Sequence, residues 1–179
     1  MLLLGTRCSL QKEGASPVLG ALDEGERFRR FMVKDYVKSV KGTEFPAFFE
    51  SDVEEQDFEE WMKVFYRYRA ELFTGGICIK EYVELKRYDG KTNEHRVFYI
   101  NNTPAAVCRN SGQAEYCPPP PRALVEKYSR LKSPFYTVDY AELEDGSWKA
   151  LEAGDGGVSG LTDVQDAESF YRALWACFA

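Results

Sequence analysis

Apolar residues alternate with polar ones in some stretches of the chain and recur at helical spacing in others. Alternation predicts β-strands, and spacing of three and four residues predicts helices. The predicted strands are FMVKDYV at 31–37, ICIKEYVEL at 77–85, and the arms of two hairpins at 94–110 and 135–157. The predicted helices follow Ser51, lie around 124–131, and start at about Asp163.

The two longer predicted helices each begin with a capping box. Ser51 is spaced correctly from Glu54, and Thr162 from Gln165, for reciprocal bonds between side chain and backbone. We expect both apolar faces to pack in the core. The faces carry Phe58, Trp61, Met62, Phe65 and Leu72 in the first helix, and Val164, Ala167, Phe170, Tyr171, Leu174, Trp175 and Phe178 in the last.

Three further segments show no strand or helix pattern. Residues 1–30 are predicted to form an irregular N-terminal segment before a domain spanning 31–179, and 86–93 a polar loop. Four consecutive prolines follow Cys117, which predicts a stiff connector. A ligand segment for a small recognition domain is the alternative for this proline run.

Composition and charge narrow the classes of function. The net charge of −6 argues against a protein that follows a nucleic-acid backbone. No apolar run reaches the length of a membrane span, and the N-terminus does not resemble a signal peptide, so we expect a cytoplasmic protein that binds no membrane. The five scattered cysteines and the single histidine, His95, argue against a zinc site, a disulfide framework and a serine-protease triad.

Turn chemistry predicts the register of both hairpins. A two-residue turn at Asn101-Asn102 pairs positions that sum to 203, placing Arg96 opposite Val107 and Glu94 opposite Arg109. A two-residue turn at Asp145-Gly146 pairs positions that sum to 291, since this dipeptide is a strong hairpin signal. Glu142 then faces Lys149, Leu143 faces Trp148, and Asp139 lies directly opposite Glu152.

The predicted Asp139–Glu152 pair suggests a metal site. Two carboxylates this close on an apolar face repel each other, and a hard cation such as Mg²⁺ relieves the repulsion. Asp155, in the glycine-rich loop that follows, is a candidate third ligand. The alternative is a solvated pair of acids at the rim of the sheet.

Basic residues on the predicted strands could hold phosphate groups. The candidates are Lys34, Lys38, Lys80 and Arg96, which together with the acid pair suggest a nucleoside triphosphate site. There is no Walker lysine loop and no dinucleotide fingerprint. Glu81 falls on the apolar face of its strand, so it lies either at an exposed strand end or in a site.

In their order these segments resemble the ATP-grasp superfamily, most closely the clade named for two arginines and a lysine. The resemblance rests on VKDYVKS at 33–39, GGICIKEYVEL at 75–85, EHRVFYI at 94–100, FYTVDYAEL at 135–143 and WKALEAGDGGVSGL at 148–161. It implies an α+β fold with an antiparallel sheet and packed helices. It also implies roles for single residues: phosphate contacts by Lys34, Lys38 and Arg96, the adenine hinge at Glu81, Tyr82 and Val83, and Mg²⁺ ligands at Asp139, Glu152 and Asp155.

The sequence departs from the clade at three points. Lys80 stands where arginine is usual, Gly157 stands where glutamine is common, and the chain begins close to the lysine strand. We therefore expect an N-terminally shortened chain with an incomplete front subdomain. Apolar surface near residues 1–30 would then be covered by a partner chain or by self-association.

The resemblance implies ATP- and Mg²⁺-dependent ligation of a carboxylate to an amine through an acyl phosphate. Lys34 and Arg96 would act in catalysis on a carboxylate and amine substrate that no residue identifies; the resemblance suggests a side chain or terminus of a peptide or protein. Binding of ATP without turnover and a purely structural interaction module are the alternatives.

Overall fold

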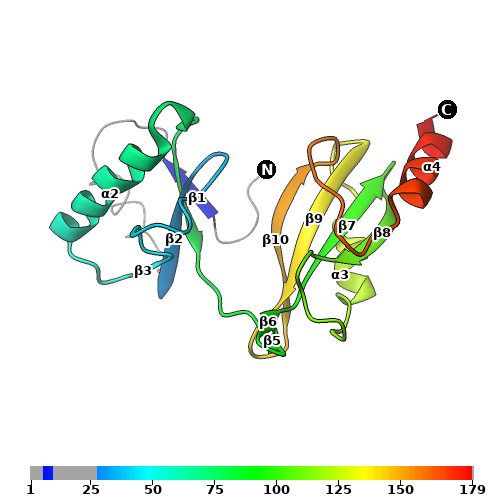
Figure 1. The fold of residues 1–179 in the computed structure, drawn as a ribbon, viewed down its shortest axis with the longest axis horizontal. Helices are drawn as coiled ribbons and strands as arrows, with labels where there is room; N and C mark the ends of the chain where they lie inside the picture. Colours follow the sequence, from blue (N-terminus) through cyan, green and yellow to red (C-terminus); the bar gives the residue numbers. More distant parts are fainter. Residues whose placement is uncertain (1–5, 10–27, 179) are drawn as a thin grey trace. The chain divides into compact units, whose positions relative to one another are not determined.

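The computed structural model describes residues 6–9 and 28–178. The chain divides into two compact units, Leu2–Val83 (the N-unit) and Glu84–Ala179 (the C-unit). Figure 1 shows that each unit contains its own sheet with helices packed beside it. Among the described residues, no helix combines the length and the apolar character that crossing a membrane requires.

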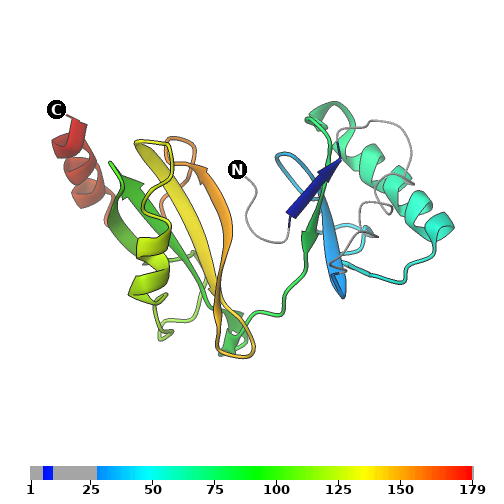
Figure 2. The ribbon, with the colours of Figure 1, turned by 180° about the vertical axis from the view of Figure 1, so that it is seen from behind.

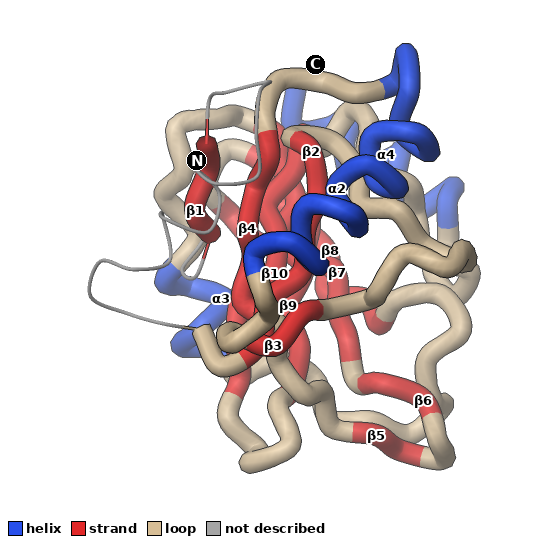
Figure 3. The backbone as a smooth tube through the Cα atoms, turned by 90° about the vertical axis from the view of Figure 1, so that its left-hand side faces the viewer, coloured by secondary structure: helices blue, strands red, loops and turns tan. Residues whose placement is uncertain are grey.

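The N-unit is a four-stranded antiparallel sheet covered by one long helix. Its strands are β1 (Thr6–Ser9), β2 (Arg30–Asp35), β3 (Phe49–Glu50) and β4 (Ile77–Glu81), in the order β1-β4-β2-β3. Helix α2 (Glu55–Arg69) lies across this sheet, as Figure 3 shows, and continues into the 3₁₀ turn η1 (Ala70–Leu72). Phe31, Val33, Ile77 and Ile79 from the sheet form the core with Phe58, Met62 and Phe65 from α2.

The C-unit is built around a second antiparallel sheet with helices on both faces. Its strands β7 (Glu94–Ile100), β8 (Thr103–Arg109), β9 (Phe135–Glu142) and β10 (Trp148–Asp155) run in the order β10-β9-β7-β8. Helix α3 (Arg122–Lys127) packs on the face that carries Val97 and Tyr99. Helix α4 (Ala167–Phe178) places Phe170 against Phe98, which lies on the opposite face because side chains alternate along β7. Figure 2 shows the ribbon of the C-unit from behind, with both helices beside its sheet.

Both hairpin registers differ in part from the prediction. Asn101 and Asn102 have positive φ and form the predicted tight turn, but Ala105 is an extra residue in β8. This bulge places Arg96 opposite Cys108, and His95 rather than Glu94 opposite Arg109. The predicted pairing of Arg96 with Val107 is therefore wrong.

The second hairpin contains two compensating differences. Its turn has three residues, 144–146, closed by a bond from Leu143 N to Ser147 O, and so Trp148 lies opposite Glu142 and Lys149 opposite Ala141. The predicted pairing of Glu142 with Lys149 is wrong. Leu151 is then an extra residue in β10, which shifts the register back by one. Asp139 consequently lies opposite Glu152, as predicted.

Both long helices begin later than their predicted caps. Helix α2 begins at Glu55, and no side chain caps its first turn, so Ser51 is not its cap. Asp166 caps α4 instead of Thr162, because its Oδ1 accepts bonds from Glu168 N and Ser169 N. Of the predicted apolar face of α4 only Phe170 is buried, whereas Trp175 is 76% exposed. Leu72 lies outside α2 and is exposed.

Two segments expected to be irregular contain short strands. Thr6–Ser9, within the N-terminal segment, forms β1 and pairs with β4. The polar stretch 86–93 forms a small hairpin of β5 (Arg87–Tyr88) and β6 (Lys91–Thr92). Residues 10–27 lie outside the described residues, so the uncovered apolar surface expected near residues 1–30 stays a prediction.

Candidate functional site

Four residues form one row across the C-unit sheet. Glu152 of β10 lies opposite Asp139 of β9, Asp139 opposite Arg96 of β7, and Arg96 opposite Cys108 of β8. Residues that lie directly opposite one another share a face of a sheet. This set, the Arg96 row, therefore lies on one face, the face opposite to α3. The bulge at Leu151 is what turns Glu152 to this face beside Asp139.

Arg96 and Asp139 form a close, two-pronged ion pair at the centre of the row. Arg96 Nε donates to Asp139 Oδ1 at 2.8 Å, and Nη2 donates to Oδ2 at 2.7 Å. The hydrogen bond and charge of Asp139 raise the pKa of Arg96 further, although burial acts in the opposite direction; the charge of Glu152 adds to the rise. The charges of both carboxylates therefore act on the one guanidinium of the row.

The loop after β10 lies along the same face. Arg96 Nη1 donates to Gly160 O at 3.0 Å, and Ser159 Oγ lies 2.8 Å from Thr137 Oγ1 in the neighbouring row. Gly156 allows this close approach, because a Cβ there would lie 2.7 Å from the ring of Phe135. The loop therefore brings a backbone carbonyl to Arg96 and a hydroxyl group to the neighbouring Thr137.

Asp155 is placed apart from the other two predicted metal ligands. It lies opposite Tyr136, and side chains alternate along a strand, so its position belongs to the other face of the sheet. Its Oδ1 accepts a bond from Gly157 N at 2.7 Å. Among residues 6–9 and 28–178, no three histidine, cysteine, aspartate or glutamate side chains are placed to hold a metal ion. The donor set on the Arg96 face is therefore two carboxylates.

Two carboxylates fit the coordination habits of Mg²⁺. This ion is usually held by one or two carboxylates and completes its shell with water and substrate phosphates. Asp139 and Glu152, which lie opposite each other, supply such a pair of hard oxygen donors.

The N-unit carries the other predicted contacts to a nucleotide. Lys34 lies opposite Cys78 and Lys80 opposite Met32, so both lysines occupy the sheet face away from the α2 core. Lys38 is not in the strand; its backbone N–H and C=O close a turn with Asp35, and its side chain is exposed. The sheet therefore brings Lys34 and Lys80 to one face, and Lys38 lies beyond the strand end.

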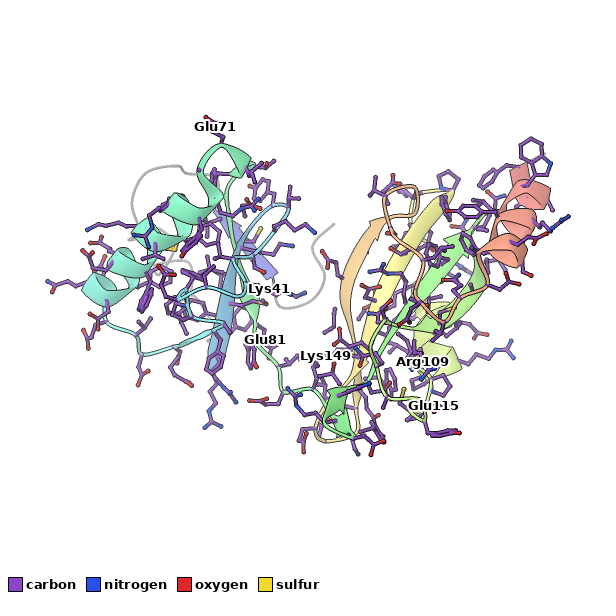
Figure 4. The ribbon with its side chains drawn as sticks, in the orientation of Figure 1. Lys41, Glu71, Glu81, Arg109, Glu115 and Lys149 are labelled. Atoms are coloured by element: carbon purple, nitrogen blue, oxygen red, sulfur yellow. The ribbon has the colours of Figure 1, made fainter. Side chains whose placement is uncertain are left out.

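The predicted hinge residues follow the end of β4. Glu81 lies opposite Phe31, on the core face as the alternation predicted, and is half-buried at the strand end. Figure 4 labels Glu81 at this end of β4. Tyr82 N donates to Arg30 O at 2.9 Å, and its ring stacks on Phe48 at 4.5 Å. Tyr82 and Val83 are half-buried, and the division between the units follows Val83.

The direct contact between Arg96 and Asp139 is the feature that sequence reasoning missed. Strands β7 and β9 are joined by a connection of more than thirty residues, so no tight turn fixes their register. Cys108, the fourth member of the row, was also missed because the bulge at Ala105 moves it opposite Arg96. The meeting of the N-unit lysines and the Arg96 row on one nucleotide stays a prediction.

Comparison with known protein families identifies the chain. The model of an ATP-grasp domain family, family 3 of the clade named for two arginines and a lysine, matches residues 19–174. The chain belongs to this ATP-grasp family. No curated protein matches it.

Solved ATP-grasp ligases share the fold. The ligase PsnB, solved with a phosphomimetic variant of a minimal precursor, Mg and ADP, is 14% identical with a TM-score of 0.55; the match covers 99% of this chain and 55% of PsnB. The D-alanine-D-alanine ligase from Coxiella burnetii is 12% identical with a TM-score of 0.51, covering 96% of this chain and 47% of the ligase. The ATP-grasp chain thus spans about half the length of these ligases, and the similarity establishes its α+β fold.

Proposed function

We propose that this ATP-grasp chain binds Mg·ATP and takes part in joining a carboxylate to an amine through an acyl phosphate. The observation that carries the proposal is the Arg96 row, in which Arg96, Asp139 and Glu152 lie side by side on one sheet face. Family membership supports the nucleotide, and ligases of known structure with this fold support the type of reaction.

The residues of the row have distinct parts in this proposal. Asp139 and Glu152 hold Mg²⁺, which when bound offsets the charge of the nucleotide phosphates. Arg96 is cationic throughout the accessible pH range and is held by Asp139 until phosphate oxygens compete for its N–H groups. Asp139 and Glu152 would hold the cation, and Arg96 would then share its N–H groups between Asp139 and the phosphates. Positioning and charge neutralisation are the main protein contributions to phosphoryl transfer.

The N-unit supplies the remaining contacts in the proposal. Lys34 and Lys80, on the sheet face away from the α2 core, contact phosphate oxygens, while the backbone of Glu81 to Val83 binds adenine. Lys80 is a point charge where arginine would bind phosphate with two N–H groups, so we expect its contact to be the weaker. Lys38 would contribute to nucleotide binding only from its turn beyond β2. Asp155 would contribute to metal binding only if its bond to Gly157 rearranged.

A second candidate function is binding of ATP without turnover. The position of Asp155 on the other sheet face favours it, because the metal then has two protein ligands rather than three. This candidate function involves no carboxylate or amine substrate. ADP release is the property that separates the two functions.

The test compares the thermal stability of the chain with ATP, with Mg²⁺, and with both. We expect ATP and Mg²⁺ together to raise Tm clearly, and Glu152→Gln to remove most of that rise. Glu168→Gln is the matched control, since Glu168 is an exposed acid of α4 paired only with Arg172 among described residues. Absence of any rise, or equal loss in both variants, would contradict the proposal. Release of ADP on adding candidate carboxylates and amines then identifies a ligase.

A further inference from the structure

A small polar cavity lies in the C-unit, lined by residues other than those of the Arg96 row. Its volume is about 270 Å³, just under the range of about 300–1,000 Å³ typical of sites for drug-sized ligands. Two basic and two acidic residues line it, together with two amides: Lys91, Arg109, Glu115, Asp163, Asn110 and Gln113. Its size suits a metabolite much smaller than a nucleotide.

The four charged side chains that line the cavity form no ion pairs with one another. None of these four charged side chains forms an ion pair with another residue that the structure describes. Arg109 is fixed in place, because its Nη1 donates to Ala114 O at 2.7 Å, and its other N–H groups have no partner among the described residues. Figure 4 labels Arg109 and Glu115, which lie at the same end of the C-unit.

Several buried polar atoms near the cavity also lack partners. Among the described residues nothing bonds to Asn110 Oδ1, Thr162 Oγ1 or Gln165 Nε2, although all three atoms are buried. Asn110 itself lines the cavity, and the other two residues flank the lining residues Asp163 and Val164. Because a buried polar atom without a partner is costly, a polar ligand in the cavity would gain by pairing Asn110 Oδ1.

The combination of charges restricts the chemistry of the ligand. A phosphate or other plain anion would face Glu115 and Asp163, and a metal ion would face Lys91 and Arg109. A molecule with both a carboxylate and an ammonium group satisfies both pairs. The unpartnered Asn110 Oδ1 is an acceptor and adds to the site for the ammonium.

The cavity shares a loop with the proposed nucleotide site but is separate from it. Gly160, whose carbonyl accepts from Arg96, is followed within a few residues by Asp163, which lines the cavity. Asp163 N donates to Ser111 Oγ at 3.0 Å and so ties this loop to the cavity's other wall. Arg109 lies opposite His95, on the sheet face away from the Arg96 row.

We infer that this cavity is a binding site for a free α-amino acid. The carboxylate binds Arg109 and Lys91, and the ammonium binds Glu115, Asp163 and Asn110. Binding requires neither ATP nor Mg²⁺, so the site stands or falls independently of the proposed ligase function.

The test is binding of the standard amino acids, one at a time, by calorimetry and ligand-observed NMR, without nucleotide. We expect at least one to bind at millimolar concentration or below. Two further probes each lack one of the two charges: the acid without the amino group and the amine without the carboxylate, which for L-alanine are propionate and ethylamine. Both should bind at least tenfold more weakly than the amino acid to which they correspond. Arg109→Gln and Lys91→Gln should each weaken binding at least tenfold.

Arg122→Gln is the matched control, because Arg122 is an exposed arginine of the same unit that pairs with Glu126. It should bind the amino acid as the unchanged chain does. Lys91→Gln keeps the test valid if loss of the Arg109–Ala114 bond disturbs the loop. No binding by any amino acid, or unchanged binding in both Lys91→Gln and Arg109→Gln, would overturn the inference.

Discussion

Among the described residues, each unit contains one close arginine–aspartate pair, and the two pairs differ in their surroundings. In the N-unit, Asp35 belongs to the core face of β2 and its side chain is 0% exposed, with Arg69 12% exposed. In the C-unit, Asp139 and Arg96 lie on the face away from α3 and are 16% and 25% exposed. The same side-chain chemistry therefore has two different consequences.

The N-unit pair is fully satisfied. Asp35 accepts bonds from the backbone N–H groups of Val37, Lys38 and Thr74 in addition to Arg69 Nε. These contacts fix the turn after β2, where Tyr36 packs against Gly75 so closely that any Cβ there would collide with the ring. A carboxylate with this many donors has no capacity left for a ligand, so we assign it a structural role.

The C-unit pair lies beside a second carboxylate. Glu152 is directly opposite Asp139, so the row contains two acids next to one arginine. Two adjacent carboxylates are hard oxygen donors of the kind that a divalent cation prefers. The comparison teaches that the surroundings of an ion pair, rather than its geometry, separate a structural pair from a candidate site.

The largest expected effect is that of Asp35→Asn on the N-unit. In either orientation the amide NH₂ group of the asparagine would face donors: Arg69 Nε and Thr74 N on one side, or the N–H groups of the turn on the other. We therefore expect the free energy of unfolding to fall by about 3 kcal/mol. Urea unfolding followed by Trp61 fluorescence, with hydrogen exchange of N-unit peptides, measures it. Glu59→Gln, an exposed acid of α2, is the control. Equal stability of both variants would show that Asp35 is not the anchor of this turn.

The effect of Asp35 should also depend on pH. Burial alone would raise the pKa of Asp35, but the bonds from Lys38, Val37, Arg69 and Thr74 outweigh it and hold the pKa below its ordinary 3.8. A lowered carboxyl pKa gives stability that is present above the unfolded value and is lost as pH falls through the folded value. The stability gap between the chain and Asp35→Asn should therefore close in acid.

Arg96→Gln should have a smaller effect on stability but a specific response to metal. Its loss removes the two hydrogen bonds that the guanidinium donates to Asp139, next to a second carboxylate, which we expect to cost about 2 kcal/mol. Mg²⁺ alone should restore part of this loss, and it should stabilise the variant more than the unchanged chain. An equal response to Mg²⁺ in both, measured by thermal unfolding, would remove the metal from the proposed site.

Much of the fold follows from the sequence, because alternation and helical spacing record which side chains the sheet and helices bury. Every predicted strand and helix exists, although several ends differ. The buried position of Asp35 was visible in the same pattern, since Phe31, Val33 and Asp35 alternate along one face. The ion pair of Asp35 could not be predicted from that pattern, because Arg69 lies on another element 34 residues along the chain.

Registers could be predicted only where turns and bulges leave a signal. The Asp139–Glu152 pair was predicted from a two-residue turn, whereas a three-residue turn and the Leu151 bulge produce it together. Two adjacent apolar residues, Ala150 and Leu151, interrupt the alternation, and this interruption is the sequence signal of the bulge. The β7–β9 register has no local signal, because it is set by packing between distant segments. Contact between Arg96 and Asp139 could therefore not be predicted.

The aromatic cores extend the comparison between the units. The N-unit core is rich in phenylalanine, with Phe31, Phe49 and Phe58 in mutual ring contact. The C-unit core is rich in tyrosine, and its buried hydroxyl groups need partners: Tyr99 Oη donates to Val125 O at 2.8 Å and lies 2.6 Å from Tyr140 Oη. The tyrosine core is therefore more sensitive to loss of a single polar atom.

Tyr99→Phe should destabilise the C-unit by about 1.5 kcal/mol. Because the proton of Tyr99 is used towards Val125 O, Tyr140 must donate to Tyr99, and removing the Tyr99 hydroxyl leaves the fully buried Tyr140 hydroxyl without an acceptor. Burial raises the pKa of Tyr99 to about 12. Stability from this neutral hydroxyl is present below the ordinary pKa of 10 and is lost as pH rises towards 12. Hydrogen exchange of C-unit peptides, measured at neutral and at alkaline pH, gives both the loss of stability in Tyr99→Phe and its dependence on pH.

Tyr140→Phe should have the smallest effect, about 0.5 kcal/mol, although it removes a hydroxyl from the same hydrogen bond. Tyr140 is the donor in that bond, so its loss leaves only a spare lone pair on Tyr99 Oη, whose own bond to Val125 O remains. An acceptor that keeps one bond costs less than a buried donor that has none. The two single variants and the double variant, compared by urea unfolding, separate the donor from the acceptor. A loss for Tyr140→Phe as large as that for Tyr99→Phe would mean that the proton order in the core is the reverse.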